Sequence, residues 1–289
     1  MQNIAATFQK DFCDQLILKL IKLQEKFQCT YLYLSGGCAL NIVTNTAIDE
    51  SGLFKEIFIP PCCNDTGLAL GAAVYAEIQK HGNIELHSPF LNNVGIEGYR
   101  AKYDLETVKK LANLLMQKKI VGICNGYGEI GPRALGNRSI LALPDSMQLK
   151  NQVSQICKQR EWYRPVAPVM LETNAIQITG KNNIPSASRY MLIDFKILPR
   201  FHKQLEGVVH VDGTSRIQVI KSREENPFIY DLLLYMDTEY GIRGLINTSF
   251  NGKGEPIVHT QEDAKNAAKK MNLDAIVING DLLESINEI

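Results

Sequence analysis

The chain has 289 residues, and its 31 basic and 31 acidic residues give a formal net charge of zero at pH 7. This balance excludes a protein that is drawn to nucleic acid or to an anionic membrane by its overall field, so any anion site must be local. The length allows one large domain or two ordinary ones, with ample material to bury a core.

The cysteines and the opening residues indicate the compartment. Seven cysteines include the vicinal pair Cys62 and Cys63, without the CxxC or His spacing of a zinc site. Such usage is typical of a reducing cytoplasm. The opening stretch MQNIAATFQKDFCDQL is polar and charged, and no run approaches the roughly 20 apolar residues of a membrane span. We therefore expect a soluble, cytoplasmic protein with no membrane partner.

The first block of the sequence alternates helices and strands. Apolar residues from Ile4 to Phe27 recur at helical spacing and predict a long amphipathic helix. Residues 30–34 and 55–59 predict strands, and each is followed by a Gly or Pro turn and then by a helix-compatible stretch. This order predicts an α/β lobe with loops at the carboxyl ends of its strands, where such folds bind ligands.

A second block follows a stretch of mixed polarity, residues 86–98, which we expect to be a linker. Patterning from residue 99 predicts a mixed α/β domain. The expected helices are 104–118, 147–157, 227–240 and 260–271. The expected strands are 120–124, 165–171, 190–195, 208–211, 217–220, 244–246 and 275–278.

The stretch GEIGPRALGNRSIL, residues 128–141, is the strongest functional signal. Its Gly and Pro residues rule out a regular helix, so Arg133 and Arg138 are expected on a tightly turning loop. Arg binds an oxyanion bidentately, and Gly lets backbone N–H groups approach the same anion. This pattern favours a phosphate or carboxylate site, and the alternative is a surface turn with two solvated arginines.

A second cluster of cations lies in KQREWYRP, residues 158–165. Lys158, Arg160 and Arg164 surround the single carboxylate of Glu161 at the predicted end of a helix. A basic helix end that complements the dipole is the structural alternative for Lys158. Arg164 precedes a proline and is expected in an extended conformation, which suits a side chain aimed at a ligand.

Two polar loops follow later in the chain. In HVDGTSR, a hairpin turn explains Asp212 and Gly213 but not Arg216. The loop NTSFNGKGEP, residues 247–256, carries amides and hydroxyls that could bind a base, a ribose or a phosphate, or that serve only the turn. Several cations on separate loops of a neutral protein indicate a multiply charged anion, such as a nucleotide with a second phosphate.

Six stretches of the sequence carry a family resemblance. GEIGPRALGNRSIL, KQREWYRPVAPVMLE, HVDGTSRIQ and NTSFNGKGEPIVHTQEDA closely resemble the carboxyl-terminal region of O-carbamoyltransferases of the nodulation and antibiotic-tailoring family. LYLSGGCALN and PPCCNDTGLALGAAVYAE resemble the end of that family's Kae1-like amino-terminal domain. The resemblance implies an α/β protein with a partial Kae1-like (ASKHA) lobe over residues 1–85 and a YrdC-like mixed α/β domain over residues 99–289.

The resemblance also implies a two-step carbamoyl transfer. In the YrdC-like domain, carbamoyl phosphate and ATP, with Mg²⁺, yield carbamoyl-adenylate and pyrophosphate. In the Kae1-like domain, a metal and the bound adenylate then present the carbamoyl group to a hydroxyl of a small-molecule or glycan acceptor. The chain is thus expected to be an O-carbamoyltransferase region whose acceptor the sequence does not identify.

The family's functional residues carry over to this chain by position. The expected catalytic cations on the phosphates are Arg133, Lys158, Arg164 and Arg216. The expected further binding residues for carbamoyl phosphate and ATP are Arg138, His210, Asp212, Asn247, Ser249 and Asn251. The Kae1-like nucleotide loop would be Ser35, Gly36, Gly37 and Asn41, and Asp65 would be the carboxylate ligand of the metal.

The chain lacks the HxxxH motif that supplies the family's other metal ligands. A divalent metal, with iron as one candidate, is therefore expected in the Kae1-like site only if another chain supplies the missing half. This leaves two alternatives to an autonomous enzyme region. The chain could be a non-catalytic subunit or fragment that completes a split Kae1-like enzyme, or an RNA-binding YrdC-like module, against which the zero net charge argues.

Overall fold

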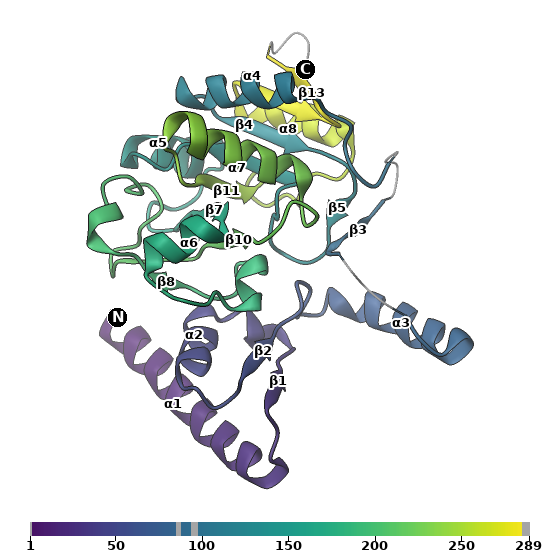
Figure 1. Cartoon of the computed structure of the whole chain (residues 1–289), viewed down its shortest axis with the longest axis vertical. Coiled ribbons are helices and arrows are strands. Elements are labelled where there is room, and N and C mark those ends of the chain that lie inside the picture. The colour runs from purple at the N-terminus through teal and green to yellow at the C-terminus, as the bar shows by residue number, and fades with distance from the viewer. Residues whose placement is uncertain (1, 85–87, 94–97, 285–289) are drawn as a thin grey trace.

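The computed structural model describes residues 2–84, 88–93 and 98–284 (Figure 1). The first block has the predicted order of helix, strand, turn, helix, strand and helix. Its elements are α1 (Gln2–Phe27), β1 (Tyr31–Tyr33), η1 (Gly37–Leu40), α2 (Ile42–Glu50), β2 (Glu56–Phe58) and α3 (Gly67–His81). Strands β1 and β2 pair in parallel. The predicted α/β character of this block is confirmed.

Local sequence explains where these helices begin and end. Asn41 caps α2, because its side chain accepts a hydrogen bond from the backbone N–H of Thr44. Gly82 ends α3 in the left-handed conformation. No residue of α3 is buried, and Figure 1 shows this helix extending away from the remainder of the chain.

The second block is built around a seven-stranded mixed sheet with the order β10-β7-β11-β6-β4-β12-β13. Its strands are β4 (Val121–Cys124), β6 (Arg138–Ala142), β7 (Ala167–Leu171), β10 (Gln218–Ile220), β11 (Leu245–Ser249), β12 (Ala275–Ile278) and β13 (Asp281–Leu283). Its longer helices are α4 (Leu105–Met116), α6 (Glu172–Thr179), α7 (Pro227–Tyr240) and α8 (Gln261–Met271). The mixed α/β fold predicted for this block is confirmed.

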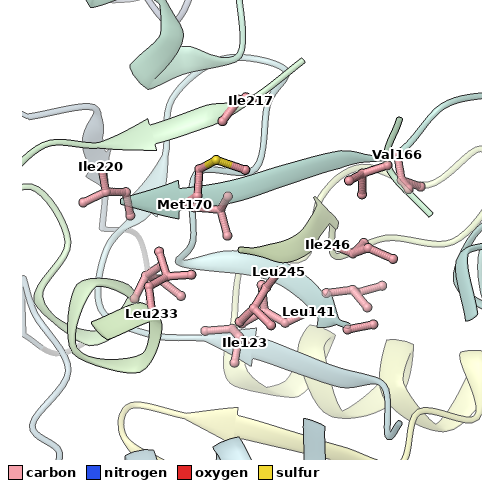
Figure 2. Close-up of a cluster of buried hydrophobic side chains, with 14 of the residues drawn as sticks. Ile123, Leu141, Val166, Met170, Ile217, Ile220, Leu233, Leu245 and Ile246 are labelled. Atoms are coloured by element: carbon pink, nitrogen blue, oxygen red, sulfur yellow. The ribbon is translucent and has the colours of Figure 1, made fainter. Parts of the chain in front are cut away.

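A continuous apolar core holds this sheet. All residues of β4, β6, β7 and β12 are buried, which matches the apolar sequences of β4, β7 and β12, whereas β6 begins with the buried polar residues Arg138 and Ser139. Figure 2 shows part of this core, with side chains from several strands meeting one from α7. The labelled residues are Ile123, Leu141, Val166, Met170, Ile217, Ile220, Leu233, Leu245 and Ile246. Among the described helices, none has the length and apolar character to cross a bilayer.

Several segments differ from the sequence predictions. Residues 208–211 form a turn instead of a strand, and Val211 is fully exposed. In the predicted strand 190–195, only Phe195 is in a strand, β8 (Phe195–Lys196), which pairs with β9 (Thr214–Ser215). The predicted linker 86–98 contains β3 (Phe90–Asn92), which pairs with β5 (Gly128–Glu129). Residues 86–87 and 94–97 of that prediction lie outside the described residues.

The predicted helix 147–157 changes its winding halfway. It starts as α5 (Met147–Asn151), capped by Ser146, and continues as a π-helix, η2 (Gln152–Cys157). The wider turn continues to Arg160, whose backbone N–H donates to the carbonyl of Ser154. Single π turns are frequent at functional sites, because they change the direction of the side chains that follow.

The two blocks are in direct contact. Asn45, on α2, is fully buried and donates to the carbonyl of Leu192 at 2.9 Å. Thr46 hydrogen-bonds the carboxylate of Asp194. Gly131 packs so closely on the first block that a Cβ there would lie 2.2 Å from the carbonyl oxygen of Pro61. The first block is therefore attached at two separate places.

Candidate functional site

The predicted motifs of the second block meet at one edge of the large sheet. Strands β6, β7 and β10 begin at this edge, and β11 ends there, because β11 runs antiparallel to β6 and β7. The loops before these three strands and the end of β11 surround a cavity of about 70 Å³. Its polar lining residues are Arg133, Arg160, Arg216, Asn247, Thr248 and Ser249.

Three arginines from three segments give this cavity its charge. In the part of the chain that the structure describes, no Asp or Glu lines it. Burial lowers the pKa of Arg216 to about 9, and repulsion from Arg133 and Arg160 adds to this effect. Burial likewise lowers the pKa of Arg133 and, together with Arg164 and Arg133, that of Arg160. The cations repel one another here, so an anion in the cavity would relieve the repulsion.

Several polar atoms around the cavity have no hydrogen-bond partner among the described residues. They are Nε of Arg133, Nε of Arg216 and Oδ1 of Asn247. Leaving a buried polar group unpaired costs roughly 1–3 kcal/mol. Such groups collected in one place indicate a site that is completed by a ligand.

Arg160 reaches the cavity because of the π-helix. Its guanidinium donates to Thr248 Oγ1 at 3.2 Å and to Ser249 Oγ at 3.4 Å, both at the end of β11. Arg160 was not among the residues selected from the sequence. The sequence signal for Arg160 is its place among the three cations of KQREWYRP. A regular helix over this stretch, as predicted, gives no reason to prefer Arg160 over Lys158 as a site residue.

Lys158 lies behind the cavity wall instead of lining the cavity. Its side chain is 1% exposed, and Nζ donates to the carbonyl and hydroxyl of Ser249 and to the carbonyl and side-chain oxygens of Asn251. Burial lowers the pKa of Lys158 to about 6, repulsion from Arg160 adds to this effect, and the nearby Cys157 opposes it. Lys158 thus fixes the end of β11, and its role as a phosphate-binding cation stays a prediction.

Ser249 and Asn251 belong to the same network. Ser249 Oγ and Asn251 Oδ1 hydrogen-bond at 2.6 Å, and Asn251 Nδ2 donates to the carbonyl of Glu255 at 2.8 Å. Ser249 lines the cavity, whereas Asn251 does not. Of these two predicted binding residues, the structure places only Ser249 where a ligand could contact it directly.

The prediction that Arg138 lies on a loop is wrong, because Arg138 begins strand β6. It is 2% exposed, and its guanidinium donates to the carbonyls of Asn125, Gly126, Asn137 and His259 at 2.8–3.1 Å. Four of its five N–H donors are therefore used by the backbone. Arg138 joins three chain segments and does not line the arginine cavity, and its role in binding stays a prediction.

Arg164 also lies outside the cavity lining. Its Nε pairs with Oε2 of Glu161 at 2.7 Å, and its side chain is 56% exposed. The predicted role of Arg164 on a phosphate stays a prediction. Its charge still acts on Arg160, as the lowered pKa of Arg160 shows. Arg164 is therefore close to the cavity without being one of its walls.

Asp212 stabilises a turn, whereas one ring nitrogen of His210 makes no hydrogen bond within the described residues. Asp212 accepts from the backbone and hydroxyl of Thr214 at 2.9 and 2.7 Å, as a turn residue does. His210 Nδ1 contacts Thr214 Oγ1 at 3.1 Å, while Nε2 has no partner within the described residues. Both residues line a larger cavity of about 770 Å³, with Trp162 and Tyr163. Pro165 and Val166 belong to the lining of both cavities.

His210 makes stability depend on pH, and we expect His210→Phe to remove part of this dependence. Burial, with repulsion from Arg216 and against the attraction of Asp212, lowers the pKa of His210 below 6.5. The unfolded chain then takes up the proton first as pH falls. The free energy of unfolding should therefore drop between pH 6.5 and the native pKa, by about 1.4 kcal/mol for each pH unit crossed. Urea unfolding at pH 7.5 and 5.5 measures this drop, and an equal drop in the variant would contradict the assignment.

The predicted residues of the first block lie on an exposed turn. Ser35, Gly36 and Gly37 are exposed, and Ser35 Oγ and Gly36 N–H both donate to the carbonyl of Cys63. Asn41 is occupied by the cap of α2 and by a hydrogen bond to Gln9 at 2.9 Å. Their nucleotide role stays a prediction.

Asp65 is exposed just before α3. The described residues contain no group of three His, Cys, Asp or Glu side chains that could hold a metal ion. Asp65 and its neighbours in the described residues therefore do not form a metal site by themselves.

Family models match both blocks of the chain. A model described as carbamoyltransferase C-terminus matches residues 112–285, and one described as carbamoyltransferase N-terminus matches residues 1–74. Nodulation protein U of Rhizobium tropici is 36% identical over 96% of this chain and 48% of its own length. Nodulation protein NolO of Bradyrhizobium diazoefficiens is 34% identical over 86% of this chain and 48% of its own length. The chain thus spans about half the length of these relatives.

Solved structures give weaker similarity. Full-length HypF in a phosphate- and nucleotide-bound form has a TM-score of 0.44 at 20% identity, over 61% of this chain and 21% of that protein. Sua5 of P. abyssi has a TM-score of 0.41 at 12% identity, over 60% of this chain and 46% of that protein. The sequence matches, in contrast, cover both blocks in the predicted order. The chain belongs to the carbamoyltransferase family.

Proposed function

We propose that this chain forms the carbamoyl-phosphate and ATP site of an O-carbamoyltransferase. The observation that carries the proposal is the convergence of Arg133, Arg160 and Arg216, from three separate loops, on one cavity with unpaired donors. A family that transfers carbamoyl groups needs a site for an anionic carbamoyl donor. Guanidinium groups are the side chains best suited to hold phosphate oxygens.

In the proposed reaction, carbamoyl phosphate loses its phosphoryl group to water as inorganic phosphate. The carbamate oxygen then attacks the α-phosphorus of ATP, and the bond to the β-phosphate oxygen breaks, which releases pyrophosphate and leaves carbamoyl-adenylate. Negative charge builds on phosphoryl oxygens in both steps. Arg133, Arg160 and Arg216 would stabilise that charge from fixed positions, and Lys158 would keep the end of β11 in place for them.

The shape of the site supports a nucleotide as the second ligand. The larger cavity has a mainly apolar lining that includes Trp162, Tyr163 and Val209, and it adjoins the arginine cavity at Pro165 and Val166. A nucleoside triphosphate has the same division into an aromatic base and an anionic end. The base would lie against the aromatic side chains, and the phosphates would extend toward the arginines.

The test is exchange of labelled pyrophosphate into ATP. We expect the purified chain, supplied with Mg²⁺, to catalyse this exchange only when carbamoyl phosphate is present. Inorganic phosphate or pyrophosphate alone should raise the melting temperature, with a stabilisation of about 2.7 kcal/mol at 100 times the dissociation constant. Folded protein that neither exchanges pyrophosphate nor responds to either anion would contradict the proposal.

Exposed apolar surface supports a second candidate function, a subunit that completes a split enzyme. Tyr33 and Phe58 stack at 5.5 Å on the two-stranded sheet, yet both are exposed. Other exposed apolar side chains of the first block are Ile4, Phe8, Leu18, Leu23, Phe27, Tyr31, Val43, Leu68, Tyr75 and Ile78. A two-stranded sheet is marginal without further strands or a covering layer.

For this second candidate, we expect the chain to form a stable complex with a polypeptide that carries the HxxxH half of the Kae1-like domain. The complex should bury Tyr33 and Phe58, so charge introduced by Tyr33→Glu should weaken it at least about tenfold, a penalty typical of an unpaired charge at an interface. Size-exclusion chromatography and titration of the two chains measure this. A monomer that stays unassociated with the second half would exclude the subunit role.

A further inference from the structure

We propose that Glu129 is a positioning residue of the arginine cavity, because its carboxylate holds the backbone of the loop that carries Arg133 and so directs this guanidinium toward a bound phosphate. This inference rests on the proposed function and adds to it a residue that acts only through Arg133. Glu129 ends strand β5 and does not line the cavity. The inference therefore concerns how a cation is held in place, and not a further contact with a substrate.

The Glu129 carboxylate accepts three hydrogen bonds from the far end of this loop. Its Oε1 accepts from the backbone N–H groups of Leu135 at 2.6 Å, Asn137 at 2.8 Å and Arg138 at 3.1 Å. Backbone N–H groups that converge in a turn form a concave site for an anion. Here the protein's own carboxylate fills that site, so residues 130–134 form a loop that is closed between Glu129 and Leu135.

Two side chains hold the carbonyl groups of the same loop. The carbonyl of Ala134 accepts from Asn247 Nδ2 at 3.2 Å, and the carbonyl of Leu135 accepts from Gln218 Nε2 at 2.9 Å. Nε of Arg133, in contrast, has no hydrogen-bond partner within the described residues. The direction of the Arg133 side chain therefore depends on the backbone that carries it.

The charge of Glu129 makes its role testable, because a positioning role and a direct electrostatic role predict opposite results. Glu129→Gln removes a negative charge close to a phosphate site, and this change alone would strengthen the binding of an anion. The substitution also replaces charge-assisted hydrogen bonds by neutral ones of about half the strength. If these bonds keep Arg133 in place, the loop occupies its binding position for a smaller fraction of the time, and the affinity for phosphate falls by that fraction.

We expect Glu129→Gln to weaken the binding of inorganic phosphate and of pyrophosphate by about tenfold. Isothermal titration calorimetry measures this at a temperature at which circular dichroism shows the variant to be folded. Asp263→Asn is the matched control, because Asp263 also accepts two backbone N–H groups, those of His259 and Thr260, but at the start of α8. The control should change the affinity by less than about twofold. Unchanged or tighter binding in Glu129→Gln would overturn the inference.

A double-mutant cycle shows whether Glu129 acts through Arg133. Arg133→Met by itself should weaken pyrophosphate binding by about tenfold to 100-fold, the effect of one lost hydrogen-bonding cation. When Glu129→Gln is added to Arg133→Met, the affinity should fall by no more than about twofold further, because the guanidinium that Glu129 positions is already gone. A full tenfold loss in both backgrounds would show that Glu129 acts independently of Arg133.

A measurement on the wild-type chain covers the case in which Glu129→Gln does not fold. If the carboxylate bonds and the phosphate contact depend on each other, saturating phosphate should slow hydrogen exchange at the three amides bound by Glu129. This slowing should exceed that of the two amides bound by Asp263 by about tenfold. Equal slowing of the two sets would overturn the inference.

The failures of the two proposals can be distinguished. If neither inorganic phosphate nor pyrophosphate binds the folded wild-type chain, the proposed function falls, and this inference falls with it. If both anions bind the wild-type chain and Glu129→Gln binds them equally well, only the role of Glu129 is overturned.

Discussion

Arg216→Met is expected to lower carbamoyl-phosphate-dependent pyrophosphate exchange by about 100-fold to 1,000-fold, as loss of one preorganised charge-stabilising group typically does. The same substitution should leave the unliganded protein as stable as before or more stable by about 1 kcal/mol, because a poorly solvated cation is replaced by an apolar side chain of similar length. Burial and two neighbouring arginines lower the pKa of Arg216 to about 9, so the surroundings of this side chain disfavour its charged form.

This prediction separates a binding role from a structural one, since the two readouts move in opposite directions. Exchange rates and the midpoint of guanidinium unfolding would be measured on the same preparations. Arg200→Met provides a matched loss of charge at an exposed position and should change neither. A large loss of stability in Arg216→Met would show that the guanidinium holds the fold and not a ligand.

Lys158→Met is expected to destabilise the chain by about 3–5 kcal/mol, because several buried oxygens lose their donor and each one left unpaired costs roughly 1–3 kcal/mol. Lys158 Nζ donates to the backbone carbonyls and the side-chain oxygens of Ser249 and Asn251, and methionine satisfies none of them. Urea unfolding monitored by circular dichroism measures the loss. Exchange activity should fall with it, because Ser249 lines the arginine cavity.

Lys150 provides the comparison for this effect. It is also buried, at 8% exposure, but its Nζ has a single acceptor, the carbonyl of Trp162 at 3.0 Å. Lys150→Met should therefore cost only about 1 kcal/mol, the net value of one hydrogen bond. Similar losses in the two variants would mean that burial of the lysine side chain, and not its hydrogen bonds, determines stability at both positions.

Much of the fold follows from local sequence. Strand β12 and helix α8 coincide with their predicted ranges to within one residue, because their apolar residues have a clear period and the helix has a strong capping box at Thr260. Residues 208–211 were misassigned because three valines in four residues favour a strand locally. In the structure, this segment turns back at Asp212 and Gly213, its only backbone bond to β9 in the described residues runs from His210 N–H to the carbonyl of Thr214, and Val211 is in solvent.

The sequence predicts where the candidate site lies, but it does not predict which of its side chains line the cavity and which hold the fold. The motifs indicated which loops would meet, and Arg133, Arg216, Asn247 and Ser249 do line one cavity. The direction of each side chain decides which cation lines the cavity. The π-helix η2 changes the direction of the side chains that follow it, and no periodicity in the sequence indicates a π-helix. Arg138 illustrates the same limit, because three of its four backbone acceptors, Asn125, Gly126 and His259, come from other segments of the chain.

The close packing of Gly131 against Pro61 links the arginine loop to the first block. Gly131 has φ +90°, and any larger residue would strike the carbonyl oxygen of Pro61. Arg133 follows two residues later and lies near enough to Cys63 to influence the pKa of its thiol. A chain shortened to begin at residue 99 would retain the large sheet but lose the surface on which this loop rests. The position of the arginine loop thus depends on both blocks, and removing the first block should loosen it.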